Sequence, residues 1–362
     1  LEGLFDRGQA ITLTGVPEGF LAMVLARLAV LAAGEGRPGL AYAASDGQQI
    51  AGLAASLAFF APWLETLVLP AWDCLPYDRV SPSAEITAQR IHALGRLARI
   101  DAGEERRRTP LLVLTTANAL VQRNAPREAM ARQSWQLAPG NRLDMEELAR
   151  WLAANGFERT PTVRERGEFA VRGGIVDLFA PGDADPVRLD FFGDTLAAIR
   201  SFDPASQRSL GQLKSVALAP MSEVELDAQS ISRFRRAYVE RFGAATRDDA
   251  LYAAVSEGRR FAGAEHWLAL FFERLDSFAD YLGRFRLCVA HHVVDAAARR
   301  LEQVRDHYEA RRLSAGSHSD HGTPYKPVEP EALYLSEDEL RAALGRLEAV
   351  ELSPFAAPER PG

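Results

Sequence analysis

The chain has 362 residues, of which 47% are hydrophobic and 25% charged, so it is long enough for two or three soluble domains. Its formal net charge of −7 disfavours broad binding to nucleic-acid phosphates, which requires a basic surface. Cys74 and Cys288 lack metal-ligand spacing and are typical of inert thiols in a reducing cytosol, and the longest apolar stretch, residues 20–33, is too short to span a bilayer. Because the first residue is Leu1 and not Met, we expect a fragment of a longer protein.

Short apolar strands alternate with helical patterns in the first third of the chain. This alternation predicts an α/β fold with a parallel sheet and flanking helices, over residues 1–132. The expected strands are at residues 10–13, 39–43, 67–69 and 111–115. The expected helices cover residues 20–33, a run that ends at residue 60, residues 84–100 and residues 117–123.

The turn after the first strand has the position of a nucleotide-binding loop but not its chemistry. Such a loop needs G-x-x-x-x-G-K-[ST], in which backbone N–H groups and the lysine hold phosphates and the hydroxyl holds Mg²⁺. Aligned on Gly19, the lysine and hydroxyl positions hold Phe20 and Leu21. The first glycine position holds Thr14, which Gly15 follows. We therefore predict a motor-like scaffold with a degenerate loop that binds no nucleotide and needs no cofactor.

Two segments of this first part could contact nucleic acid. Trp72 and Tyr77 could stack on bases, but aromatic residues beside prolines are more often part of a core. The arginines at 106–108 follow Glu104 and Glu105, so their charge is partly offset. We expect a buried aromatic pair and a solvated loop instead of a nucleic-acid interface.

Residues 133–221 are expected to form a second, α+β domain inserted into the first. Residues 135–139 predict a strand, 143–155 predict a helix, and 166–204 predict an antiparallel meander. Within this meander, Gly173-Gly174 suits a bulge or a close backbone approach, and Gly193-Asp194 suits a two-residue hairpin turn.

The middle strand of this meander alternates between two kinds of side chain. Val187, Leu189 and Phe191 point to one face and should contact a core, because successive side chains of a strand alternate. Arg188, Asp190 and Phe192 point to the other face and should meet solvent or a partner.

The segment GEFAVRGGIVDLFAPG…PVRLDFFGDTLAAIRSFDP, at residues 167–204, resembles the UvrA-binding domain shared by UvrB and the transcription-repair coupling factors. The resemblance covers essentially the whole chain, and residues 263–272 favour the coupling factors over UvrB. It implies a UvrA contact at Arg172 in AVRGG, Arg188 in PVRLD and Phe192 in LDFFGD. Arginine and aromatic residues dominate binding hot spots, which agrees with this assignment. Whether Arg172 lies beside Arg188 depends on strand register, which stays open.

Residues 222–330 are expected to complete the motor-like domain, and residues 331–362 to form a terminal helix and linker. His291-His292 follow a predicted strand at 286–290, where a motor of this family places an Asp-Glu pair that holds Mg²⁺ and activates water. Two imidazoles cannot do this, and no further ligands stand at zinc-site spacing, so no metal is expected. Residues 294–312 predict a helix, 313–330 a flexible linker, and 338–350 a helix capped by Ser336.

The resemblance implies a non-catalytic adaptor that recruits UvrA by mimicking UvrB and links stalled transcription to nucleotide excision repair. In such proteins RNA polymerase and DNA bind through other modules, one of which is an ATP-dependent DNA translocase, and no membrane is involved. One alternative is an active UvrB- or helicase-like ATP-dependent repair enzyme, which Phe20 and His291-His292 disfavour. Another is a damaged-DNA-binding module, which the acidic balance disfavours.

Overall fold

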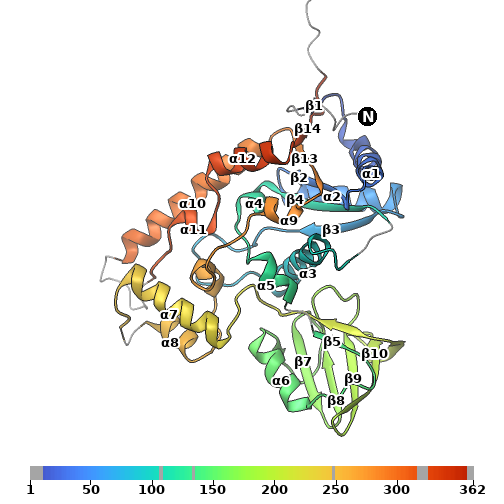
Figure 1. Cartoon of the computed structure of the whole chain (residues 1–362), viewed down its shortest axis with the longest axis vertical. Helices are drawn as coiled ribbons and strands as arrows, with labels where there is room; N and C mark the ends of the chain where they lie inside the picture. The colour runs from blue at the N-terminus through green and yellow to red at the C-terminus, as the bar shows by residue number, and fades with distance from the viewer. Residues whose placement is uncertain (1–10, 106–108, 133–134, 247–248, 316–324, 357–362) are drawn as a thin grey trace, which may run out of the picture.

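The computed structural model describes residues 11–105, 109–132, 135–246, 249–315 and 325–356. Its elements build a parallel sheet with helices on both faces and a separate antiparallel sheet (Figure 1). The predicted fold class is therefore confirmed. The arginines at 106–108, which we expected in a solvated loop, lie outside the described residues.

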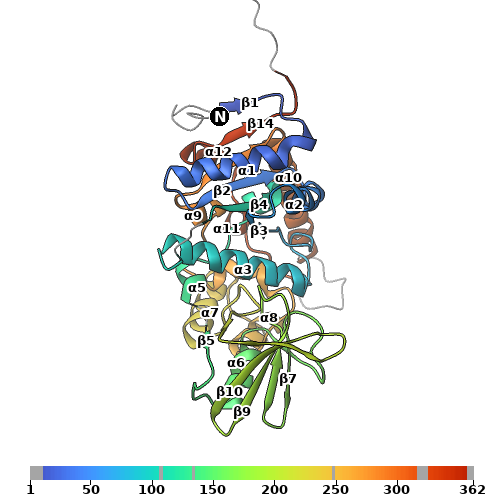
Figure 2. The same ribbon diagram turned by 90° about the vertical axis from the view of Figure 1, so that its right-hand side faces the viewer.

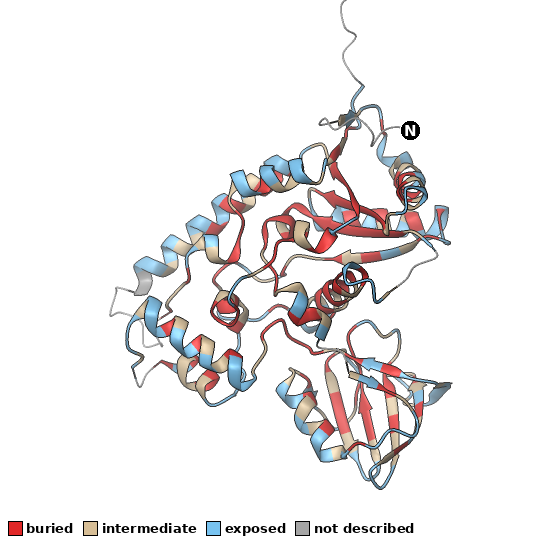
Figure 3. Ribbon diagram, viewed as in Figure 1, coloured by how far each residue is buried: buried red, intermediate tan, exposed pale blue. Residues whose placement is uncertain are grey.

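The parallel sheet has six strands, in the order β1-β14-β13-β2-β4-β3. Their bounds are Ile11–Leu13 (β1), Gly39–Ala44 (β2), Glu65–Leu69 (β3), Leu111–Thr116 (β4), Arg286–Ala290 (β13) and Val350–Leu352 (β14). Every residue of β2 and β4 is buried (Figure 3). Continuous apolar runs are what a parallel strand needs when helices cover both of its faces.

Helices cover both faces of this sheet (Figure 2). One face packs against α1 (Glu18–Gly34) and α2 (Gly47–Phe60). The other face contributes to a larger core that includes the remaining helices outside the inserted domain. These are α3 (Ala84–Asp101), α4 (Ala117–Val121), α5 (Arg127–Arg132), α7 (Ala228–Phe242), α8 (Ala250–Ser256), the 3₁₀ helix η1 (Ala264–Leu270), α9 (Phe278–Leu282), α10 (Val293–Ala315), α11 (Pro330–Leu333) and α12 (Glu337–Arg346).

The antiparallel sheet belongs to the segment between β4 and β13. Its order is β11-β10-β9-β8-β7-β6, with β6 and β7 parallel, and a separate pair joins β5 to β12. The bounds are Trp135–Leu137 (β5), Glu158–Arg159 (β6), Glu168–Arg172 (β7), Ile175–Leu178 (β8), Val187–Phe192 (β9), Thr195–Phe202 (β10), Ser209–Leu213 (β11) and Val216–Leu218 (β12). One helix, α6 (Met145–Ala154), covers one face of the sheet and shares its core.

Of the two alternatives predicted for Gly173-Gly174, a bulge or a close backbone approach, the structure has the second. These residues form the turn between β7 and β8 and not a bulge, because Arg172 pairs directly with Ile175. The close backbone approach is present, since a Cβ on Gly174 would lie 3.0 Å from the Phe191 carbonyl oxygen. The irregularities in strand pairing that the structure shows in this sheet lie instead in β10, between Leu196 and Ala198 and between Ser201 and Phe202.

The C-terminal part of the chain differs more from the elements predicted from the sequence. The helix expected over residues 338–350 ends at Arg346, and Val350–Leu352 forms β14 between β1 and β13. Hydrogen bonds on both sides stabilise this strand, a non-local effect that helical periodicity does not report. The predicted linker at 313–330 is also packed in part, because Tyr325 is buried and the Trp267 Nε1–H donates to the Lys326 carbonyl at 2.7 Å.

Side chains cap the N-termini of α6 and α12, two helices that the sequence predicts. The Asp144 carboxylate accepts the Glu147 N–H at 2.8 Å, and Ser336 Oγ accepts the Glu339 N–H at 3.2 Å. Each cap satisfies an N–H group that has no partner inside its helix.

The inserted segment is held against the parallel-sheet part by polar contacts. Arg166 pairs with Glu85 of α3 at 3.1 Å, and Arg260 Nη2 donates to the Ala154 carbonyl at 2.7 Å. The domain boundaries given above stay a prediction. None of the helices in the described ranges combines the length and apolarity that crossing a bilayer requires.

Candidate partner-binding site

The outward face of the antiparallel sheet, opposite α6, carries the predicted contact residues. In β9, Val187 and Leu189 are buried in the core, whereas Arg188 and Asp190 are partly exposed on the other face. The alternation expected for this strand is therefore present, and its outward residues come from a sheet whose other face is fully packed.

Strand register places Arg172 and Arg188 on either side of one carboxylate. Asp177 of β8 stands directly opposite Arg188 of β9 and Ala170 of β7, two residues before Arg172. Arg172 Nη2 donates to Asp177 Oδ2 at 2.5 Å. Arg188 donates from Nε to Oδ1 at 2.7 Å and from Nη2 to Oδ2 at 2.9 Å. The question left open by the sequence is thus answered, since the two guanidinium groups bind the same aspartate.

The side chains of Arg172 and Arg188 differ in their exposure, and so in how accessible they are to a partner. The side chain of Arg172 is 49% exposed and that of Arg188 is 18% exposed. The Arg188 guanidinium lies over the Phe202 ring, 4.8 Å from its centroid. Its hydrogen bonds to Asp177 raise the pKa of Arg188. Arg188 is therefore the more firmly held, and Arg172 the more accessible.

Phe192 stands at the end of β9, where the hairpin turns into β10. Gly193, with φ +59, begins this turn, and Phe192 pairs with Thr195 across it. The Phe192 side chain is 85% exposed, so it does not belong to the core of the isolated chain. A large apolar ring at a hairpin tip is accessible to a partner from several directions.

Sequence reasoning missed two residues of this face, Asp177 and Arg200. Asp177 is 1% exposed and bonds both arginines, and a second ion pair joins Arg200 of β10 to Asp190 of β9, with Arg200 Nε 2.9 Å from Asp190 Oδ2. The signal for Asp177 was available, because it is the acid at the outward position of an otherwise apolar strand. Arg200 could not be placed without the register that sets it opposite Arg188.

The loop at residues 14–19 lies at the carboxyl end of β1, and two of its backbone N–H groups are bonded to the C-terminal segment. The Gly15 N–H donates to the Phe355 carbonyl at 2.8 Å, and the Val16 N–H donates to the Ser353 carbonyl at 3.0 Å. Phe20 follows in the first turn of α1 and is 59% exposed. The chain after β14 therefore takes up N–H groups that a phosphate-binding loop would direct at its ligand.

His291 and His292 follow β13, and His291 faces the C-terminal segment. His291 Nδ1 lies 2.5 Å from Glu351 Oε1, and its ring contacts that of Phe355, with 5.5 Å between centroids. His292 Nδ1 lies 3.2 Å from Asp295 Oδ2. Within the described ranges, no three His, Cys, Asp or Glu side chains are grouped so that they could hold a metal ion.

Comparison with known proteins places the inserted segment in a family. Residues 135–224 match the UvrB interaction domain. The transcription-repair-coupling factor of Haemophilus influenzae is 33% identical over 77% of this chain and 23% of its own length. Those of Escherichia coli K12 and Myxococcus xanthus are 30% and 36% identical, over 81% and 76% of this chain and 24% and 23% of theirs.

The chain is a relative of the transcription-repair coupling factors. The resemblance predicted from the sequence, to their N-terminal module, is confirmed. The chain spans about a quarter of the length of the curated relatives it matches. Arg172, Arg188 and Phe192 all lie within the segment that matches the UvrB interaction domain.

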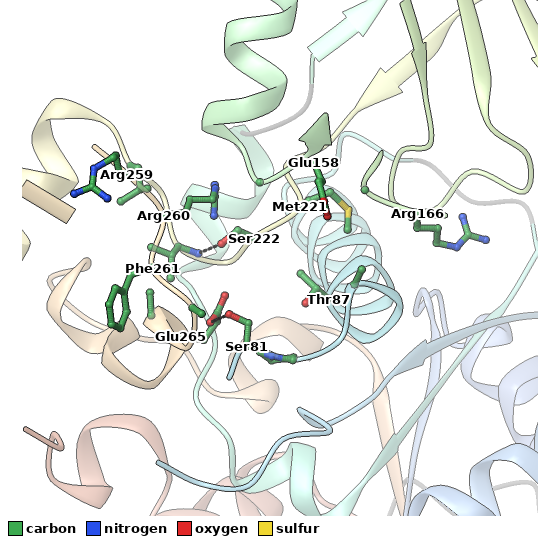
Figure 4. Close-up of a pocket in the computed structure, with 18 of the residues that line it drawn as sticks. Ser81, Thr87, Glu158, Arg166, Met221, Ser222, Arg259, Arg260, Phe261 and Glu265 are labelled. Carbon is green, nitrogen blue, oxygen red and sulfur yellow. Dashed lines mark hydrogen bonds between the residues drawn. The ribbon is translucent and has the colours of Figure 1, made fainter. Parts of the chain in front are cut away.

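A cavity of about 320 Å³ lies between the inserted segment and the helices beside it (Figure 4). Arg166 and Glu158 line it from the inserted segment, and Arg260 and Glu265 from the segment after α8. Ser81 Oγ donates to Glu265 at 2.7 Å, and burial raises the pKa of Glu265. The lining thus mixes both signs of charge and favours no single class of ligand.

Proposed function

We propose that the chain is a non-catalytic adaptor that recruits UvrA to a transcription-repair coupling protein by presenting the surface that UvrB presents. The match of residues 135–224 to the UvrB interaction domain supports this proposal. The observation that carries it is the outward face itself, where Arg172 and Arg188 share Asp177 on the same sheet as the exposed ring of Phe192.

This face has the composition of a binding hot spot. Arginine and aromatic side chains dominate measured hot spots, because they combine a large apolar area with directed hydrogen bonds. Three arginines and two aspartates, Arg172, Arg188, Arg200, Asp177 and Asp190, leave one positive charge in excess. On a chain whose net charge is −7, such a face suits an acidic patch of UvrA that also has an apolar pocket for Phe192.

The adaptor is proposed to act without ATP. The Gly15 and Val16 N–H groups are bonded to the segment at residues 353–355, and the lysine position holds Phe20. This arrangement supports the adaptor over an active ATP-dependent repair enzyme. RNA polymerase and DNA would then be bound by other parts of a longer protein.

The direct test is to measure binding of purified UvrA to this chain by calorimetry, with and without Arg172→Ala. Removing an exposed hot-spot arginine should cost about 2 kcal/mol, which weakens binding roughly thirtyfold. The matched control is Arg150→Ala, because Arg150 is exposed on α6 at the opposite face of the same domain. Failure of the unsubstituted chain to bind UvrA, or equal losses for both variants, would contradict the proposal.

A further inference from the structure

The outward face contains a charged group that is hidden from any partner. The Asp177 side chain is 1% exposed, yet its two oxygens accept three hydrogen bonds from Arg172 and Arg188. Burial of a carboxylate is costly unless paired charges and hydrogen bonds compensate it, and here both compensations come from the predicted contact residues.

The geometry around Asp177 restricts both arginines. Arg188 uses Nε and Nη2 as a fork on the two carboxylate oxygens, and its guanidinium also lies over Phe202. Arg172 reaches the same carboxylate through one nitrogen only, Nη2. A guanidinium has five N–H donors, so Arg172 keeps most of its donors for another group while one bond fixes its direction.

We propose that Asp177 is a positioning residue for UvrA binding, which holds the Arg172 and Arg188 guanidinium groups in the orientation that an acidic group of UvrA accepts. The inference rests on the proposed function and extends it to a residue that does not touch the partner. Its physical basis is that an arginine side chain held before binding loses less rotamer freedom when the complex forms.

Asp177→Asn tests this proposal, because long-range attraction and positioning predict opposite results. The substitution keeps the side-chain size and removes one negative charge, so the face becomes more positive. If only net charge mattered, binding to an acidic partner should become tighter. Positioning predicts that UvrA binding weakens instead, by about tenfold, as expected for groups coupled in one hydrogen-bond network. Unchanged or tighter binding by the folded variant overturns the inference.

A second pair of variants covers the case in which Asp177→Asn unfolds. Arg188→Gln and the double variant Asp177→Asn, Arg188→Gln are compared, because the double variant removes the buried Asp177 charge together with the charge of Arg188. Positioning predicts that the double variant binds UvrA several-fold more weakly than Arg188→Gln, since Arg172 then loses its charge-assisted bond to a carboxylate. Equal binding by the two, with both folded in thermal melts, shows that Asp177 serves the fold alone.

Failure of this inference can be told from failure of the proposed function. If Arg172→Ala and Phe192→Ala weaken UvrA binding but the Asp177 variants do not, the adaptor role stands and the positioning role is wrong. If the unsubstituted chain does not bind UvrA, both are wrong.

Discussion

Phe192→Ala offers a sharp test of where the partner binds, because the structure predicts its effects on binding and stability separately. The Phe192 side chain is 85% exposed, so most of its apolar area is available for burial in a complex. Full burial of a phenylalanine side chain contributes about 1.5–3 kcal/mol. Burial of the exposed part of Phe192 in a complex would therefore contribute about 2 kcal/mol to the binding free energy. We therefore expect UvrA binding to weaken roughly thirtyfold.

The same exposure predicts that the fold tolerates this substitution. The small part of Phe192 that is already buried contributes less than about 0.5 kcal/mol to folding. The melting temperature should therefore fall by no more than about 2 °C. By contrast, Phe202 is 0% exposed beneath Arg188, and Phe202→Ala should cost about 3–5 kcal/mol of folding free energy.

The assay is calorimetry with UvrA at two salt concentrations, with thermal melts of every variant. The Phe192→Ala loss should be nearly independent of salt, because apolar burial is not screened, whereas the Arg172→Ala loss should shrink as salt rises. The matched control is Phe59→Ala, since Phe59 is 79% exposed at the end of α2, outside the UvrB interaction domain. Full affinity in a well-folded Phe192→Ala variant, or an equal loss in Phe59→Ala, would refute this placement of the site.

Four further outcomes are expected. Arg188→Lys should bind UvrA more weakly than the unsubstituted chain, because a lysine cannot replace the fork on Asp177, and equal affinity would show that only the charge matters. Calorimetry with millimolar Mg-ATP should show no binding, because the Gly15 and Val16 N–H groups are already bonded, and micromolar affinity would contradict this. Gel shifts at physiological salt should show little DNA retention by a chain of net charge −7, and tight damage-selective binding would favour a DNA-binding module instead. Burial lowers the pKa of His266 to about 4 from 6.5, so the unfolded chain takes up this proton first and stability falls as the pH drops below 6.5. Urea unfolding measures this fall in unfolding free energy between pH 7 and pH 5, and the fall should be about 2 kcal/mol smaller in His266→Gln than in the unsubstituted chain. An equal fall in both proteins would indicate that other groups cause it.

The amino-acid sequence alone determined the type and approximate position of most elements. The apolar runs at β2 and β4 are buried throughout, and the alternation in β9 placed Arg188 and Asp190 on the outward face. These properties depend on the period of a single strand or helix, which neighbouring residues set. The missing nucleotide-binding motif after the first strand could also be recognised from the sequence, because Phe20 occupies the lysine position whatever the surrounding fold.

Only the tertiary structure decided which residues meet. Asp177 joins Arg172 to Arg188 because β8 lies between β7 and β9 in one particular register, and a slip of one residue would turn Asp177 into the core. Val350–Leu352 became a strand because β1 and β13 bond it from both sides, although the predicted helix included Val350 and no strand was expected here. Such pairings join segments far apart in the chain, so their free energy depends on contacts that no local pattern contains.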